Sequence, residues 1–292
     1  MVAWILLSFI AAFMKASKQL TTKIATSHAS SFETSWLYRV FSVPLLFFAV
    51  LITGFVRPDN LLYFSGLLAA DVLLFSSLTL SIVKGYQLSD ISKVGPLLAT
   101  YPVFLAIPAV FILGEIPSLL STLGILLVVG GAYWINLSES ASPLEPVLSL
   151  KDDKGVQYVI LGLVLSAVVP SLDKLGIQST SPITWTLLVH IGAAIVLTVT
   201  SQFVTRKRTA SEIPRKDFRA IALVSVFSVG IWLCQAYAYE LTKVVYVQSI
   251  KSAGVILTAF FGGFLLNEQD TKRRTLAAAV IVLGATFVLL GG

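Results

Sequence analysis

The chain has 292 residues, of which 56% are hydrophobic and only 12% are charged, and its formal net charge is +6. Its mean hydropathy is +0.88, whereas roughly a quarter of the residues in a soluble domain are charged. These values exclude an ordinary soluble globular protein and favour a chain embedded in a lipid bilayer.

Apolar stretches long enough to cross a bilayer follow one another along the whole chain. A helix of about 20 apolar residues spans the hydrocarbon core, because lipid offers no partner for a free backbone N–H or C=O group. In chain order the stretches are Val2–Lys23, Phe32–Phe55, Leu61–Lys84, Leu88–Leu113, Ser118–Leu137, Val156–Ile177, Pro182–Val204, Phe218–Leu241, Val244–Leu266 and Thr275–Leu290. The sequence therefore predicts an all-α, polytopic membrane protein with ten transmembrane helices.

The second half of the chain repeats the first. Residues 87–137 align without a gap on residues 240–290, and the alignment superposes Glu115 on Glu268 and the pair Gly131-Ala132 on Gly284-Ala285. Each copy contains five helices, an odd number, so the second copy must enter the membrane from the opposite side. We predict two inverted five-helix repeats, residues 1–137 and 156–292, joined by a linker at 138–155. Inverted repeats are typical of transporters that work by alternating access.

Basic residues are distributed unevenly between the two predicted sides of the membrane. One side would hold only Arg57, Lys174 and Lys243, and the other would hold Lys23, Lys84, Lys93, Lys151, Lys154, Arg206, Lys207, Arg208, Arg215, Lys216, Arg219, Lys272, Arg273 and Arg274. The positive-inside rule then places both termini outside the cytoplasm, and the cell membrane is the expected location. Juxtamembrane residues of this kind face anionic lipid headgroups, so the net charge requires no nucleic acid.

Several short motifs carry a resemblance to a known family. They are Arg39, Gly95-Pro96-Leu97-Leu98, Tyr101-Pro102, Gly114-Glu115, Ile250-Lys251-Ser252, Gly262-Gly263 and Asn267-Glu268. With the repeat, the chain resembles the drug/metabolite transporter superfamily in its ten-helix EamA-like form. The resemblance implies a secondary transporter, with export preferred over import. It also implies a central cavity lined mainly by the first, third, fourth, sixth, eighth and ninth helices. Where the first half has Arg39, the second half has His190.

Lys251 is the main candidate for substrate binding. It lies about two turns into the ninth stretch, where the alignment matches it to the apolar Leu98. A charged residue at the centre of a bilayer costs about 2.5 to 3.5 kcal/mol on insertion scales, so it needs a partner or a wet cavity. Lys251 either meets an anionic group of the substrate, or reaches the interface or a buried acid in a structural role.

Asp71 and Lys18 are the other charged candidates for the cavity. Asp71 lies near the middle of the third stretch, where it could pair with Lys251 or Lys18 or accept a proton that couples transport to a gradient. Lys18 shares a helical face with Lys15, and an offset of 156 positions superposes it on Lys174, which follows Asp173. Alternatively, these lysines reach the interface and pack the two halves together.

Aromatic and amide side chains could form a wall of the cavity. Trp232, Gln235 and Tyr239 are spaced so that they share one face of the eighth helix, and Tyr101 lies in the fourth. This combination would suit a metabolite with an aliphatic or aromatic body, whereas Tyr239 alone could be an interfacial residue.

Prolines mark candidate hinges. Pro96, Pro102 and Pro108 recur every six residues in the fourth stretch, and each removes one backbone hydrogen bond. We expect this helix to be bent, mobile and part of the cavity wall, and we expect Pro170 to break the sixth helix similarly. A purely structural kink is the alternative at each proline.

Three further charged residues are expected to be structural. Glu115 and Glu268 end their helices near the interface and should fix the adjoining turns by hydrogen bonds. Arg39 should form an ion pair or bind helix-end carbonyl groups, because its helix is expected at the periphery.

The sequence as a whole favours a secondary active transporter of a small organic metabolite that works by alternating access through a central cavity. The alternatives are an anion exchanger of the organophosphate or sugar-phosphate type that uses Lys251, and a membrane scaffold or sensor without transport. An enzyme is disfavoured, because His28 and His190 are the only histidines and no spacing suggests a catalytic or metal site. The expected partners are a substrate, the bilayer and a coupling proton or ion, with no cofactor, in a monomer or homodimer.

Overall fold

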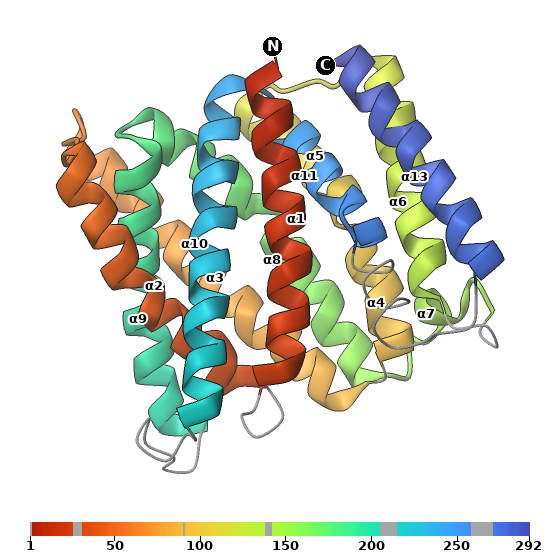
Figure 1. Cartoon of the computed structure of the whole chain (residues 1–292), viewed down its shortest axis with the longest axis horizontal. Helices are drawn as coiled ribbons and strands as arrows, with labels where there is room; N and C mark the ends of the chain where they lie inside the picture. Colours follow the sequence, from red (N-terminus) through yellow and green to blue (C-terminus); the bar gives the residue numbers. More distant parts are fainter. Residues whose placement is uncertain (1, 26–30, 90, 138–141, 205–214, 258–270) are drawn as a thin grey trace.

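The computed structural model describes residues 2–25, 31–89, 91–137, 142–204, 215–257 and 271–292, and every regular element in these ranges is a helix (Figure 1). The helices are α1 (Val2–Ala25), α2 (Ser31–Thr53), α3 (Leu61–Leu88), α4 (Ile91–Ala99), α5 (Tyr101–Leu113), α6 (Leu119–Asn136), α7 (Glu145–Leu148), α8 (Lys154–Gln178), α9 (Pro182–Val204), α10 (Arg215–Leu241), α11 (Val244–Ala253) and α13 (Thr271–Gly291).

Ten apolar segments correspond to the predicted spans. Within the described residues, eight helical segments are long and apolar enough to cross a membrane, and Val244–Leu257 and Thr275–Gly291 are shorter apolar helices. The fourth span consists of α4 and α5, and α7 lies in the linker. The predicted all-α membrane architecture is confirmed.

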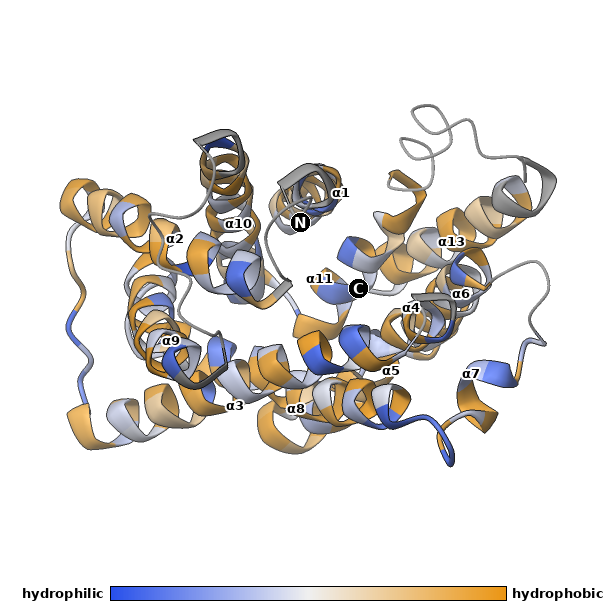
Figure 2. Ribbon diagram, turned by 90° about the horizontal axis from the view of Figure 1, so that it is seen from below, coloured by the Kyte–Doolittle hydropathy of each residue, from blue (hydrophilic) through white to orange (hydrophobic). Residues whose placement is uncertain are grey.

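The helices pack in pairs that follow the repeat. In the order of the two halves, α1 corresponds to α8, α2 to α9, α3 to α10, α4–α5 to α11, and α6 to α13. The pairs α2–α9 and α6–α13 join corresponding helices, and exchanging the halves turns the pair α1–α10 into α8–α3. Figure 2 shows α2 and α9 at one end of the bundle, α6 and α13 at the other, and the remaining two pairs on opposite faces between them. The halves are therefore related by an approximate twofold axis.

The contact between α6 and α13 shows this symmetry at the level of the backbone. A Cβ atom added to Gly131 would lie 3.0 Å from the carbonyl oxygen of Ala277, and one added to Gly284 would lie 2.7 Å from that of Gly124. The sequence alignment matches Gly131 to Gly284 and Gly124 to Ala277. The two close approaches are thus copies of one contact, and each needs a residue without a side chain.

The order of these contacts gives the relative direction of α6 and α13. Moving along α6 from Gly124 to Gly131, the neighbouring residue in α13 moves back from Gly284 to Ala277. Corresponding helices of the two halves are therefore antiparallel, which is possible only if one repeat is inverted relative to the other.

The α2–α9 pair gives the same result at the other end of the bundle. Trp36, early in α2, donates a hydrogen bond of 2.9 Å to Thr198, late in α9. Leu46, late in α2, lies in one apolar cluster with Ile183, early in α9. The inversion of the repeats is thus supported independently at both ends of the twofold arrangement.

Asp153 fixes the beginning of α8 to the end of α3. Its carboxylate accepts hydrogen bonds from the backbone N–H groups of Gly155 at 2.8 Å and Val156 at 3.2 Å, and from the Ser89 hydroxyl at 2.7 Å. Lys93 lies 3.7 Å away. Partial burial opposes ionisation, but these hydrogen bonds and the nearby Lys93 outweigh it and hold the pKa of Asp153 below its ordinary value.

A Cβ atom at position 284 should loosen the α6–α13 pair. We expect Gly284→Ala to lower the free energy of unfolding by about 1 to 3 kcal/mol, because the added atom would meet backbone that cannot move independently. Gly130→Ala is the control, since a Cβ there meets nothing within 4 Å. Thermal unfolding in detergent, followed by a thiol-reactive dye on Cys234, measures both, and equal midpoints for the two variants would contradict this packing.

The Asp153 cap predicts a pH dependence of stability. Because its pKa is lower in the folded protein than in the unfolded chain, its contribution is complete above the unfolded value of about 3.9 and is lost as the pH falls through the folded value. Asp153→Asn keeps a capping oxygen but does not titrate. The stability difference between wild type and Asp153→Asn should therefore shrink as the pH is lowered from about 6 to about 3. Asp152→Asn, which removes an adjacent carboxylate outside the cap, is the control.

Candidate functional site

A cavity lies between α1, α3, α4, α6 and α11, and we call it the lysine pocket. Its volume is about 150 Å³, and it is lined by Lys15, Ala16, Gln19, Tyr86, Gly95, Leu98, Ala99, Ala132, Asn136, Ser252, Gly254 and Val255. Lysine, amide and hydroxyl groups are thus combined with apolar side chains, as in sites that bind small organic molecules. Both repeats contribute to the lining.

Three lysines cluster beside this pocket. Lys15 lines it, while Lys18 of α1 and Lys251 of α11 lie close enough to Lys15 for their charges to interact. Lys18 donates a hydrogen bond of 3.2 Å to Ser228, and its ammonium lies 3.7 Å from the centre of the Tyr38 ring. Lys251 donates to the side-chain oxygen of Gln235. The predicted residues Lys251 and Gln235 are therefore brought together.

The wall formed by α10 divides into two parts. Gln235 and Tyr239 face α11, where Tyr239 is fully buried and its hydroxyl is hydrogen-bonded to Gln248. Trp232 faces α3 and α9, with its ring centroid 5.6 Å from that of Phe75 and 5.6 Å from that of His190. Tyr239 is thus an interior residue, and the interfacial alternative does not apply to it.

The side chain of Arg39 also points into the bundle, although its helix, α2, lies at one end of the bundle. Its side chain is 1% exposed, its guanidinium lies 4.0 Å from the centre of the Phe75 ring, and Nη1 lies 3.2 Å from Nε2 of His190. The expected contact with helix-end carbonyl groups is replaced by this contact with His190, the residue that occupies the corresponding region of the second half. Arg39 and His190, which occupy related positions in the two repeats but differ chemically, are therefore in contact.

The hydrogen bonds of His190 determine its tautomer. Nδ1 lies 2.8 Å from the carbonyl oxygen of Thr186, which can only accept, so Nδ1 carries the hydrogen. Nε2 faces a guanidinium that can only donate, so it must present its lone pair. His190 is consequently neutral in this arrangement, and the positive charge belongs to Arg39.

Asp71 and Asp173 form a second buried polar group. Asp71 of α3 is fully buried, and among the described residues neither of its carboxyl oxygens has a hydrogen-bond partner. Asp173 of α8 is 4% exposed and accepts a hydrogen bond of 2.8 Å from the indole N–H of Trp185. Asp71 therefore lies with Asp173 and Arg39, its electrostatic neighbours, and is not hydrogen-bonded to either expected partner, Lys251 or Lys18.

The prolines of the fourth span divide it into two helices. α4 contains Pro96 and ends at Ala99, and α5 begins with Tyr101-Pro102 and contains Pro108. At the junction, Thr100 donates its hydroxyl to the carbonyl oxygen of Leu97 at 2.6 Å. In the other half, α11 ends at Ala253, close to the position matched to Ala99, and Gly254 follows. A break thus occurs at corresponding places in both repeats.

Pro170 does not break the sixth span, contrary to the prediction. α8 runs without interruption from Lys154 to Gln178. A proline lacks the N–H that would bond to the carbonyl four residues earlier, which here belongs to Ser166. The hydroxyl of Tyr101 donates to that carbonyl oxygen in a long hydrogen bond of 3.4 Å. Tyr101 therefore acts as a local substitute for the missing N–H.

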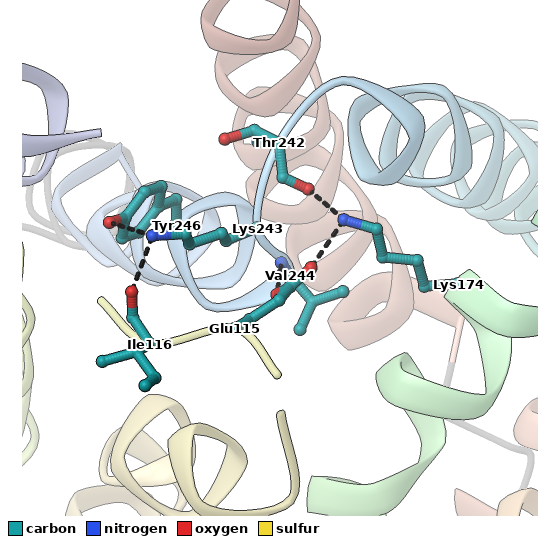
Figure 3. A network of polar contacts seen from close by, with 7 residues as sticks. All are labelled: Glu115, Ile116, Lys174, Thr242, Lys243, Val244 and Tyr246. Carbon is teal, nitrogen blue, oxygen red and sulfur yellow. Dashed lines mark hydrogen bonds and ion pairs between the residues drawn. The ribbon is translucent and has the colours of Figure 1, made fainter. Parts of the chain in front are cut away.

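A polar network (Figure 3) joins helix ends on the side of the bundle where both termini lie (Figure 1). One oxygen of Glu115 lies 2.6 Å from the ammonium of Lys174, and the other accepts a hydrogen bond of 2.8 Å from the backbone N–H of Val244 at the beginning of α11. Lys174 also donates to the carbonyl oxygen of Thr242 at 2.7 Å, and Lys243 donates to that of Ile116 at 2.7 Å. Glu115 thus holds α8 and α11 of the second repeat against the end of α5.

The sequence prediction identified part of this arrangement. Lys251 with Gln235, and Tyr101 with Tyr239, are brought together in the interior, but none of the seven predicted cavity residues lines the lysine pocket. Glu268 and the Gly262-Gly263 pair lie outside the described residues. Among the described residues, no group of three or more His, Cys, Asp or Glu could hold a metal ion.

Several residues of the site were not predicted from the sequence as members of it, namely Asp173, His190 and the pocket residues Tyr86, Asn136 and Ser252. Asp173 and His190 are isolated in an apolar sequence, and the cost of burying such groups was the available signal. The polar pocket residues carry no comparable signal, because Tyr, Asn and Ser are common near helix ends.

The two ion pairs between described residues should contribute very differently to the free energy of unfolding. Glu115→Ala removes one partner of a pair whose side chains are only 12% and 10% exposed, so we expect a loss of about 3 to 5 kcal/mol. Lys93→Ala breaks the pair with Asp153, whose side chains are 29% and 18% exposed, and should cost about 1 kcal/mol or less. Thermal unfolding in detergent compares the two variants. A smaller loss of stability for Glu115→Ala than for Lys93→Ala would show that the Glu115 network does not stabilise the fold in this way.

Comparisons with known proteins agree with this architecture. The sequence matches the EamA-like transporter family over residues 2–137 and again over residues 153–290, once in each half. No curated protein matches it. One solved structure, described only as "Crystal structure of protein", has a similar fold with a TM-score of 0.78 at 14% sequence identity, covering 98% of this chain and 96% of the other. The chain is therefore a multi-pass membrane protein that belongs to the EamA-like transporter family.

Proposed function

We propose that this transporter carries a small organic anion by alternating access through the interior of the bundle. The observation that carries the proposal is the cluster of Lys15, Lys18 and Lys251. Among the described residues, no carboxylate lies within 4.0 Å of any of these three ammonium groups. The hydrogen-bond partners of Lys18 are the hydroxyl groups of Ser228 and Tyr38, and the partner of Lys251 is the side-chain amide of Gln235.

Three neighbouring cations inside a membrane protein are unfavourable without an anion. Each loses hydration on burial, and their like charges repel. An anionic substrate that enters the lysine pocket would offset both effects by contact with Lys15 and by attraction to Lys18 and Lys251. Among the described residues, Asp173 is the carboxylate that acts on Lys251, and it also accepts a hydrogen bond from Trp185.

The remaining lining of the pocket suits an organic body. Tyr86, Asn136 and Ser252 offer hydrogen-bonding groups, and Leu98 and Val255 offer apolar contact. A small carboxylate or phosphate ester combines these requirements, whereas a purely apolar compound would leave the lysines unpaired.

The two sides of the bundle that would face the two sides of the membrane support alternating access. The lysine pocket includes Gln19 and Asn136, near the ends of α1 and α6, and lies toward the basic side that we assign to the cytoplasm of the cell. The network of Glu115 and Lys174 holds the opposite end together. Exchanging the conformations of the two inverted repeats would close the side with the lysine pocket and open the side with the Glu115 network. The breaks after Ala99 and Ala253 are the positions at which we expect the chain to bend.

Charge should decide which compounds bind. We expect glycerol 3-phosphate and L-glutamate to raise the thermal unfolding midpoint of the purified protein, and glycerol and choline to leave it unchanged. Lys15→Ala and Lys251→Ala should each weaken anion binding about tenfold or more, because one charged hydrogen-bond partner contributes about 1.5 to 3 kcal/mol. Lys151→Ala, in the exposed linker, is the matched control.

Transport itself is measured by counterflow of the same labelled anions in proteoliposomes. Wild type and Lys151→Ala should exchange them, while Lys15→Ala and Lys251→Ala should not at low substrate concentration. Equal binding and exchange in the Lys251→Ala and wild-type proteins would refute the role of Lys251. Counterflow of choline but not of either anion would refute the anionic class.

A further inference from the structure

Asp71 is placed where its protonated form fits better than its ionised form. It lies in the middle of α3, is 0% exposed, and has no hydrogen-bond donor at either carboxyl oxygen among the described residues. An ionised carboxylate buried without donors is strongly disfavoured, and a neutral carboxylic acid avoids most of that cost.

Asp173 has a different environment. One of its carboxyl oxygens accepts a hydrogen bond of 2.8 Å from Trp185, and Lys251 and Arg39 both attract the carboxylate, whereas its other oxygen has no hydrogen-bond partner among the described residues. An indole N–H can only donate, so this contact favours the ionised acid. Two neighbouring carboxyl groups in unlike environments are a typical arrangement for dividing the ionised and the protonated state between two acids.

The two acids and Arg39 form one electrostatic unit. The charge of Asp173 acts on Asp71 and opposes a second negative charge there, and Arg39 acts on both acids. The Nε–H of Arg39 has no partner among the described residues, while Nη1 is occupied by His190. When Asp71 loses its proton, Arg39 therefore still has a free donor for the new carboxylate.

Other charged and titratable groups surround this unit on several helices. They are Tyr38 on α2, Lys15 and Lys18 on α1, Tyr101 on α5, His190 on α9, Tyr239 on α10 and Lys251 on α11. Lys93 of α4 is paired with Asp153, and Lys174 of α8 is paired with Glu115. Both ring nitrogens of His190 are already hydrogen-bonded, and one oxygen of Asp173 has a donor, so Asp71, with no donor at either oxygen among the described residues, is best placed to hold a proton.

Arg39 and Asp173 couple Asp71 to the lysines through their charges. Both act on Asp71, and in addition Asp173 acts on Lys251 and Arg39 acts on Lys18. Asp71 belongs to the first repeat and Asp173 to the second, on helices α3 and α8 that pack together. Movement of one repeat against the other therefore changes the distance between the two acids.

From this geometry we propose that Asp71 carries the proton that is coupled to transport, with Asp173 and Arg39 as positioning residues. Asp71 takes a proton from water on one side of the membrane in one conformation and releases it to water on the other side in the alternative conformation. The released carboxylate is then compensated by Arg39. This inference rests on the proposed transport function but does not depend on the identity of the anion.

Infrared spectroscopy locates the proton without any substrate. Purified wild-type protein at neutral pH should show the carbonyl stretch of a buried carboxylic acid, and Asp71→Asn should lose this band. Asp173→Asn and Asp59→Asn, the latter in the exposed loop before α3, should keep it. A band that persists in Asp71→Asn but disappears in Asp173→Asn would overturn the assignment to Asp71.

Transport in proteoliposomes tests the coupling, with glycerol 3-phosphate and L-glutamate as probes. Wild type should accumulate a probe in response to an imposed pH gradient, and Asp71→Asn should lose this accumulation while its counterflow stays within about threefold of wild type, since exchange needs no net proton movement. Accumulation by Asp71→Asn, or wild-type counterflow without any response to pH, would overturn the inference and leave the proposed function standing. Absence of wild-type counterflow would instead count against the proposed function.

Two further variants cover the case in which Asp71→Asn does not fold. Asp71→Glu should keep gradient-driven accumulation with an altered pH profile, and an unaltered profile would overturn the inference. Asp173→Asn removes the neighbouring negative charge, so the pH midpoint of accumulation should move to lower values. A merely structural role of Asp173 would lower the rate without moving that midpoint.

Discussion

The backbone contact between α6 and α13 is the constraint on which the rest of the structure depends. In lipid, apolar side chains gain little by leaving their surroundings, so helices associate through close packing. Gly131 and Gly284 permit that packing, and a side chain at Gly284 would meet the backbone of the partner helix at 2.7 Å. Because the two helices are corresponding members of the repeats and run antiparallel, this contact also fixes the inversion. It defines one end of the twofold arrangement, and α2 with α9 defines the other.

Between the α2–α9 pair and the α6–α13 pair, charged residues near the termini differ from those in the interior in how well they are paired. On the side of the termini, Glu115 and Lys174 neutralise each other at 2.6 Å, and the backbone of α11 completes the network. Among the described residues deeper in the bundle, no carboxylate lies within ion-pair distance of Lys15, Lys18 or Lys251, and no donor contacts the carboxyl oxygens of Asp71. The side of the termini is thus held by paired charges, while the interior contains charges that are incompletely satisfied, and our two proposals rest on this difference.

The sequence was sufficient for the architecture, because the relevant signals are strong in a membrane protein. Spans appear as long apolar stretches, and the repeated Gly131-Ala132 and Gly284-Ala285 pairs mark the same packing contact twice. The site was harder to predict, since lipid is as apolar as a protein core. Hydropathy then does not separate the lipid-facing side of a helix from its interior side. Arg39 on an end helix was for this reason expected in a peripheral role, although its side chain is 1% exposed and contacts His190.

Proline positions illustrate the same limit at the level of the backbone. Pro96 and Pro102 flank the observed break of the fourth span, yet α11 ends at the corresponding place without a proline. Pro170 leaves α8 continuous, and the carbonyl that it leaves free accepts a hydrogen bond from Tyr101 at 3.4 Å. Whether a proline breaks a helix thus depends on tertiary partners, which local sequence does not reveal.

The inverted arrangement of the repeats is tested most directly by the sidedness of two corresponding positions, the segment after α6 and the segment after α13. In a Cys234→Ser background, Leu144→Cys and Gly292→Cys would be labelled in intact cells with a membrane-impermeant thiol reagent; Leu144 is 62% exposed. Inverted repeats require the two sites to lie on opposite sides of the membrane, so Gly292→Cys should be labelled in intact cells and Leu144→Cys only after the membrane is opened. Labelling of both positions from the same side would contradict the account.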